Sequence, residues 1–172
     1  MAATDYANFK RTAGAAANAF ETILEVQPYG TGTPTETAWK PVPDLNNFDP
    51  AFTPQTKDTT VYGDKGSTSV TKTGDDWAAS FNHLVLRTAT GEFAEPTVTF
   101  LRASEGTGSA NLLHIRYYDA LGASYAYQGV ASVSVKRQNT GATDTNWFTV
   151  NLTGNAKFSP ITNPIAPTGG GE

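Results

Sequence analysis

The feature that most constrains this chain is a set of short segments in which apolar and polar residues alternate. The clearest segment is residues 76–87, where Trp77, Ala79, Phe81 and Val85 share one side of an extended chain. Further segments predicted to be strands are residues 20–27, 111–118, 123–128, 130–137 and 147–152. Side chains of a strand point alternately to its two faces, so this spacing predicts half-buried β-strands. Turn-forming residues separate the segments, and the combination indicates a mainly β domain.

The length of 172 residues fits one domain. We expect a two-sheet β-sandwich or partly open barrel with one flanking α-helix. The helix is predicted to start at Glu95-Pro96 and to end at Gly106, although the β-branched residues of 97–99 favour a strand. The expected organisation has four parts: an N-terminal arm (1–19), the β domain (20–159), a hairpin or loop within it (46–74) and a Pro/Gly-rich tail (160–172).

Residues 46–74 form a long polar stretch with little apolar periodicity. The turn-forming sequence Gly63-Asp64-Lys65-Gly66 lies between two runs rich in Thr, Val and Tyr, which predicts a polar hairpin. A polar stretch of this length inside a compact domain is usually functional or disordered. We therefore expect the segment to be mobile in a free subunit and ordered by contact with another one.

The residues that most catalytic sites require are missing from the sequence. Cysteine is absent, which excludes disulfides, thiolate metal sites and a cysteine nucleophile. The two histidines, His83 and His114, lie in predicted strands without a nucleophile and carboxylate arranged around them. Asp75-Asp76 has no third carboxylate at the spacing of a metal-binding loop. We expect a protein that is not an enzyme and that needs neither a metal nor a cofactor.

The formal net charge of -4 is concentrated in one stretch. Between residues 21 and 58 there are six acidic residues and two basic ones: Glu21, Glu25, Glu36, Asp44, Asp49 and Asp58, with Lys40 and Lys57. A duplex DNA-binding surface is usually basic, and this sequence has no basic stripe. If the acidic stretch lined a conduit, it would repel phosphate and let DNA slide.

The sequence offers no sign of membrane targeting. No apolar run approaches the ~20 residues that a membrane-spanning helix needs. The first residues lack a basic segment followed by an apolar one, so no secretory signal is expected. We expect synthesis in the cytoplasm and no membrane partner.

Several segments, in this order, resemble the major tail tube proteins of long-tailed, siphovirus-type bacteriophages. They are WKPVPDL (39–45), KDTTVYGDKG (57–66), KTGDDW (72–77), NLLHIRYYD (111–119), YQGV (127–130), VSVKR (133–137) and VNLTGN (150–155). The likeness spans roughly residues 38–164 and depends on order and spacing, because no single motif is diagnostic. The N-terminal arm matches no pattern.

This resemblance implies a structural protein of the virion tail. Copies would form homo-hexameric rings whose inner sheets join into a barrel of about 24 strands, and rings would stack into a tube through which genomic DNA passes without tight binding. The implied partners are other copies, the tape measure protein, the tail terminator and tail tip proteins. Candidate contacts between subunits or rings are Lys57, Asp58, Tyr62, Asp64 and Lys65, and candidate lumen-facing residues are Glu21, Glu25 and Asp58.

A β-sandwich that binds carbohydrate or protein is the alternative class. Its binding platform would consist of exposed aromatic side chains, and Trp39, Tyr62 and Trp77 are the candidates. The two classes differ in what purified protein does, since tubes or rings indicate the first and dispersed monomers the second.

Overall fold

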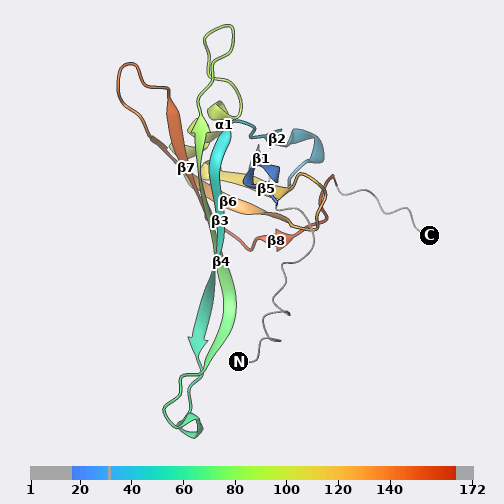
Figure 1. Ribbon diagram of the computed structural model, residues 1–172, viewed down its shortest axis with the longest axis vertical. Helices are drawn as coiled ribbons and strands as arrows, with labels where there is room; N and C mark the ends of the chain where they lie inside the picture. Colours follow the sequence, from blue (N-terminus) through green and yellow to red (C-terminus); the bar gives the residue numbers. More distant parts are fainter. Residues whose placement is uncertain (1–16, 31, 166–172) are drawn as a thin grey trace, which may run out of the picture.

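The computed structural model describes residues 17–30 and 32–165, which form eight strands joined in one antiparallel, hydrogen-bonded sheet (Figure 1). The strands are β1 (Thr22–Pro28), β2 (Lys40–Pro41), β3 (Leu45–Asp58), β4 (Val70–Leu84), β5 (Leu112–Asp119), β6 (Ala126–Arg137), β7 (Trp147–Gly154) and β8 (Ser159–Pro160). Their order across the sheet is β2-β1-β5-β6-β7-β4-β3, and β8 pairs with β6. The helices are α1 (Thr97–Glu105) and the 3-10 turns η2 (Ala19–Glu21), η3 (Glu36–Ala38), η4 (Tyr62–Asp64) and η5 (Gly108–Asn111).

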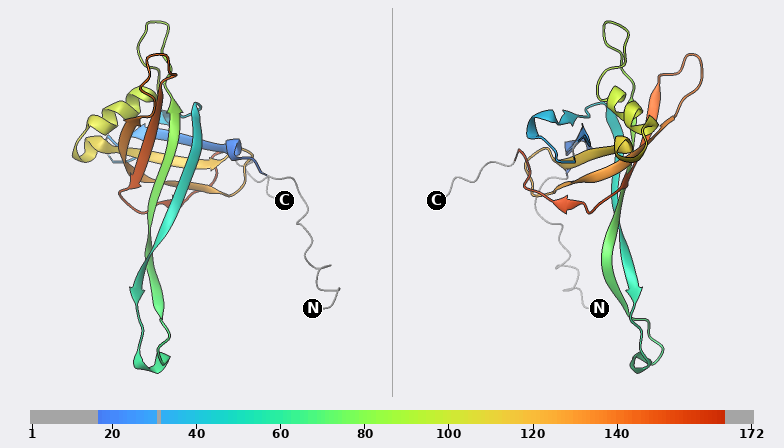
Figure 2. Two further views of the ribbon diagram at one scale, coloured as in Figure 1. Left: turned by 60° about the vertical axis from the view of Figure 1, so that its left-hand side comes forward. Right: turned by 180° about the vertical axis from the view of Figure 1, so that it is seen from behind.

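The sheet bends so that its β1–β5–β6 half packs against its β7–β4–β3 half, and the two halves cross at a steep angle (Figure 2). Aromatic side chains join the halves: the ring centroids of Trp77 and Tyr117 are 6.0 Å apart, and those of Phe48 and Tyr117 are 5.4 Å apart. The sheet does not close into a barrel. The sandwich prediction is confirmed, with the difference that its two layers are halves of a single sheet.

The apolar side chains that alternate along the strands form the core. From β4 these are Trp77, Ala79 and Phe81, and from β7 they are Phe148, Val150 and Leu152. The facing half of the sheet contributes Leu24, Val26, Leu113, Ile115, Tyr117, Ala131 and Val133. The alternation in the sequence therefore identified the buried faces of these strands correctly.

The predicted helix is confirmed as α1, which begins after Pro96 and ends before Gly106. Its residues 97–99 are β-branched, yet they are helical because Phe100 packs in the core, 5.6 Å from the ring of Phe81. Thr97 is also held by His83, whose Nε2 lies 2.8 Å from the threonine hydroxyl. Tertiary packing thus outweighs the weak local preference for a strand.

The structure corrects several strand boundaries. Residues 123–128 and 130–137 were expected to be two strands, but β6 continues from Ala126 to Arg137 through Gly129. The ring of Phe158 packs directly over Gly129, where a Cβ atom would collide with it. The strand expected at 76–87 begins earlier, at Val70, and ends at Leu84. Residues of the expected polar loop form most of β3, which is an edge strand and therefore tolerates its prolines.

Part of the expected C-terminal tail is integrated into the fold. Ser159 and Pro160 pair with β6, and Asn163 is buried. The Asn163 side-chain amide donates hydrogen bonds of 2.8 Å to the carbonyls of Asp119 and Ala123. The remainder, residues 166–172, and most of the expected N-terminal arm lie outside the described residues.

Acidification is expected to lower the free energy of unfolding between about pH 6.5 and pH 5. Burial lowers the pKa of His83 and of His114 below the ordinary value of 6.5. The unfolded chain therefore binds protons first as the pH falls through 6.5, and the folded chain loses stability until its own histidines titrate. The carboxylates titrate below this window.

The measurement is the urea midpoint at pH 7.5, 6.5 and 5.5 for the wild type and for the double variant His83→Gln/His114→Gln. The variant should be less stable at pH 7.5 but should show a flatter pH dependence. An equally steep loss in both proteins would contradict the assignment to these two histidines.

Candidate assembly surfaces

One broad surface of the sheet has no other part of the described chain packed on it. It consists of the outward side chains of β6, β7, β4 and β3, which alternate with the core residues. On the body of the protein these are Ser132, Ser134, Lys136, Thr149, Asn151, Thr153, Asp76, Ala78, Ser80, Asn82, Asp49, Ala51 and Thr53, and each is exposed or half-buried. We call this set the uncovered face.

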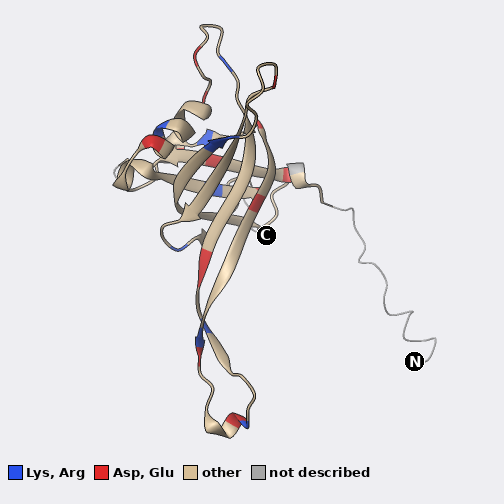
Figure 3. Ribbon diagram, turned by 90° about the vertical axis from the view of Figure 1, so that its left-hand side faces the viewer, with Lys and Arg blue, Asp and Glu red and all other residues tan. Residues whose placement is uncertain are grey.

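The uncovered face is polar but nearly uncharged, and the strands of the body are largely tan in Figure 3. Two carboxylates (Asp49, Asp76) and one ammonium (Lys136) give it a formal net charge of -1. Neighbouring side chains bond to one another, as in the 3.2 Å hydrogen bond that the Thr149 hydroxyl donates to Asn82 Oδ1. Such a surface is well hydrated and offers no apolar or basic patch to a ligand.

The opposite outer surface, on β1 and β5, is covered by residues 32–39, which we call the strap. Arg116 of β5 holds it in place: its guanidinium donates to Glu25 over 2.5 Å and to Glu36 over 2.8 Å. The guanidinium carbon also lies 4.5 Å from the ring centroid of Trp39. Because the strap covers β5, that strand is buried on both faces.

The β3–β4 hairpin extends far beyond the body (Figures 1 and 2). Trp77 is the last buried residue of β4 toward the tip, and every residue of 51–58 is exposed. We call residues 51–76 the arm. A two-stranded hairpin with no hydrophobic face is at best marginally stable in water. The arm therefore needs contacts that the isolated subunit does not provide.

Local hydrogen bonds shape the tip of the arm. The amide of Thr60 donates to the Asp58 carboxylate over 2.8 Å, and the amide of Val61 donates to Asp64 over 2.9 Å. The bonds from Thr60 lower the pKa of Asp58 below its ordinary value. This ordering leaves Tyr62 fully exposed at the end of the arm. A large aromatic side chain in that position is typical of an anchor for a partner surface.

The structure places the predicted contact residues together on the arm. Lys57, Asp58, Tyr62, Asp64 and Lys65 all belong to it, and among the described residues none of the four charged ones forms an ion pair. Their role in contacts between subunits stays a prediction.

The residues predicted to face a lumen are not brought together. Asp58 lies on the arm, and Glu21 lies in η2 with its carboxylate bonded to Asn18. Glu25 pairs with Arg116 under the strap, and its side chain is only 13% exposed. Sequence reasoning overlooked the uncovered face instead. The signal for it was present in the Ser, Thr and Asn residues that alternate with the core of β4, β6 and β7.

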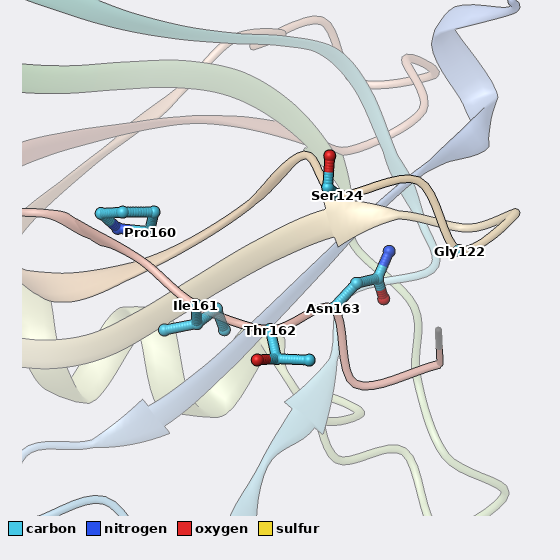
Figure 4. Close-up of a pocket in the computed structure, with 6 residues that line it drawn as sticks. All are labelled: Gly122, Ser124, Pro160, Ile161, Thr162 and Asn163. Atoms are coloured by element: carbon cyan, nitrogen blue, oxygen red, sulfur yellow. The ribbon is translucent and has the colours of Figure 1, made fainter. Parts of the chain in front are cut away.

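A shallow pocket of about 470 Å³ lies beside the β5–β6 turn, where the C-terminal segment crosses it (Figure 4). Its lining residues are Gly122, Ser124, Pro160, Ile161, Thr162 and Asn163. The buried Asn163 already has its amide and carbonyl bonded, so it offers no polar group to a ligand. The pocket marks the point where the C-terminal segment is fastened to the body.

The described residues contain no group of three or more His, Asp and Glu side chains placed to hold a metal. His83 and His114 are buried strand residues that contact Thr97 and the ring of Tyr29. None of the described helices has the length and apolar character needed to cross a bilayer.

The aromatic binding platform of the alternative class does not form. Trp39 is buried beneath the strap, and Trp77 is buried in the core, stacked on Phe158 at a centroid distance of 3.8 Å. Only Tyr62 of the three predicted aromatics is exposed. These tryptophans stabilise the fold rather than bind a ligand.

Comparison with solved structures identifies the fold. A chain from the tail of an empty GTA particle with C6 symmetry superposes with a TM-score of 0.61, covering 85% of this chain and 99% of that one at 12% identity. A chain of the SPP1 tail tube gives 0.63, covering 86% and 81% at 8% identity. A chain of the six-fold symmetrised anti-feeding prophage baseplate gives 0.51, covering 88% and 100% at 8% identity.

No protein-family model and no curated protein matches the sequence. At these identities the likeness concerns the fold, and the fold is that of phage tail tube proteins. The resemblance drawn from the sequence is confirmed at this level.

In a free subunit, the amides of residues 51–58 and 70–76 are expected to exchange with solvent far faster than those of Ala79–His83. The arm buries almost no apolar surface, whereas the upper half of β4 lies in the core. Hydrogen–deuterium exchange on dilute protein measures the difference. Protection of the arm equal to that of the core, at concentrations where ultracentrifugation shows monomers, would contradict the expectation.

Proposed function

We propose that this protein is the wall-forming subunit of a phage tail tube. The observation that supports this function most strongly is the division of the molecule into a polar, uncovered face and an arm without a partner. The first suits the wetted wall of a channel, and the second suits a contact between successive rings. Both features belong to a fold whose solved neighbours come from tails.

The uncovered face is proposed to line the channel. Hydroxyl and amide groups bind water, and a net charge of -1 for each copy repels phosphate weakly. Most of the basic residues lie elsewhere, and Arg116 and Lys40 are already paired with carboxylates. DNA would pass along such a wall without the counterion release that makes phosphate binding tight.

The arm is proposed to reach the adjacent ring. Its exposed charges would pair across the interface, with Lys57, Asp58, Asp64 and Lys65 as the candidates, while Tyr62 would insert into the neighbouring subunit. Contacts of this kind join unlike surfaces, so they repeat without closing and produce a filament.

Six copies in each ring are favoured by the symmetry of the solved neighbours, two of which were determined with six-fold symmetry. By the same reasoning, the partners would be the tape measure protein, the tail terminator and the tail tip proteins of a siphovirus-type virion. The tube would serve as the conduit for DNA ejection.

Purified protein is expected to form rings or tubes visible by electron microscopy. Deleting residues 59–69, none of which is buried, should leave the circular dichroism spectrum and melting temperature of the body nearly unchanged but prevent tube growth. Sedimentation that shows only monomer at high concentration for the intact chain would contradict the proposal. Tubes formed by the deletion variant would contradict the role of the arm alone.

Assembled tubes are expected to bind duplex DNA weakly, with little dependence on salt. The measurement is a titration of fluorescent duplex DNA at several ionic strengths, with the variant Asp49→Lys/Asp76→Lys for comparison. Reversing these two charges should strengthen binding and steepen the salt dependence if the uncovered face lines the lumen. Submicromolar affinity of wild-type tubes at physiological salt would contradict a passive conduit.

A further inference from the structure

The free edge of β3 contains two prolines, Pro50 and Pro54, on the part of the strand nearest the body. Among the described strands β3 pairs only with β4, so its other edge has no backbone partner. Unpaired edges usually invite pairing with another chain. The prolines decide what kind of chain this edge can accept.

The hydrogen-bond pattern of β4 shows which backbone groups of β3 point to the free edge. The amide of Leu84 donates to Asp44 on the β3 side, and the amide of Val85 donates to Asn146 on the β7 side. Even-numbered residues in this part of β4 therefore bond to β3 and odd-numbered ones to β7. The odd-numbered residues Ala79, Trp77 and Asp75 lie opposite Pro50, Phe52 and Pro54, respectively.

The backbone groups of Pro50, Phe52 and Pro54 consequently face away from β4, because opposed residues that do not bond to each other both point outward. Proline has no N–H, so this stretch presents three carbonyls and a single amide donor. Two copies paired through this stretch, with Phe52 opposite Phe52, would have donors for two of the six ladder hydrogen bonds. The edge rejects a second copy of itself.

The other border of the uncovered face has the opposite character. The amide of Gln138 donates to Trp147 on the β7 side, so the backbone groups of Val135 and Arg137 face away from β7. The β5 ladder ends at Ser132, and no described strand pairs with β6 beyond it. Both residues have N–H groups, which can donate to the carbonyls of a β3 edge.

The two edges also run in compatible directions. Each step from β6 to β7, β4 and β3 is antiparallel, so β6 and β3 are antiparallel to each other. Rotation about a ring axis preserves these directions, and the β3 edge of one copy would meet the β6 edge of the next as an antiparallel pair.

We propose that Pro50 and Pro54 make the free edge of β3 selective: it accepts the β6 edge of a second copy and rejects another β3 edge. The prolines thereby direct assembly toward unlike edges and away from a two-fold dimer. This inference rests on the proposed ring-forming function for its partner, whereas the rejection of self-pairing concerns the subunit itself.

Cysteine cross-linking tests the partner, because the natural chain has no cysteine. Thr53 and Ser134 lie on the uncovered face near the two edges. With a short bifunctional maleimide, the double variant Thr53→Cys/Ser134→Cys should give covalent oligomers larger than dimers, and either single variant should give monomers. Rings that form without this cross-linked series would overturn the pairing of β3 with β6 while leaving the proposed function intact.

The prolines are tested in the Thr53→Cys background by adding Pro50→Thr/Pro54→Thr. These changes restore two donors, and the yield of disulfide-linked dimers should rise several-fold. The matched control is Pro164→Thr, an exposed proline away from the edge, which should leave the yield unchanged. Unchanged melting temperatures exclude unfolding as the cause.

Dimers of Thr53→Cys that form equally well with and without the prolines would overturn the selectivity. This comparison is made on dilute subunits and is informative even if the intact chain forms no rings. In that event the proposed function would fail separately from the edge rule.

Discussion

The contact between Trp77 and Tyr117 determines how the two halves of the sheet meet. Tyr117 is fully buried, and its hydroxyl accepts a 3.3 Å hydrogen bond from the Trp77 indole. Trp77 also stacks on Phe158, which packs over Gly129. Because Trp77 is the last buried residue of β4 before the arm, the same contact fixes the base of the arm. Burial raises the pKa of Tyr117, so this hydrogen bond persists at any physiological pH.

Bending one sheet against itself leaves the protein with two outer surfaces of different kinds. The surface on β1 and β5 is covered by the strap, and the ion pairs of Arg116 there offset the burial of its charge. The surface on β6, β7, β4 and β3 stays open. A surface exposed to water over four strands is stable only if its side chains are polar, and those of the uncovered face are mostly Ser, Thr and Asn. Composition and architecture therefore agree.

Alternation in the sequence predicted the strands of the body and their buried sides because a side-chain period of two is decided locally. It could not show that the sheet folds back on itself, since that depends on contacts such as Trp77–Tyr117 between residues 40 apart in sequence. The arm was visible only as a turn at Gly63–Gly66, because its strands bury no periodic face. Glu25 was misjudged as a lumen candidate because its acidic character says nothing about Arg116, which lies far along the chain.

The stability of the body and the weakness of the arm are complementary. The body buries a continuous core and folds without a partner, whereas the arm gains too little apolar burial to offset the conformational entropy of its residues. An arm that is ordered mainly by its partner contributes contacts at assembly and makes each addition reversible until further contacts form. The prolines on the β3 edge act earlier, by removing hydrogen bonds that two free subunits could otherwise make. A subunit built in this way remains separate until it meets the unlike edge of another copy.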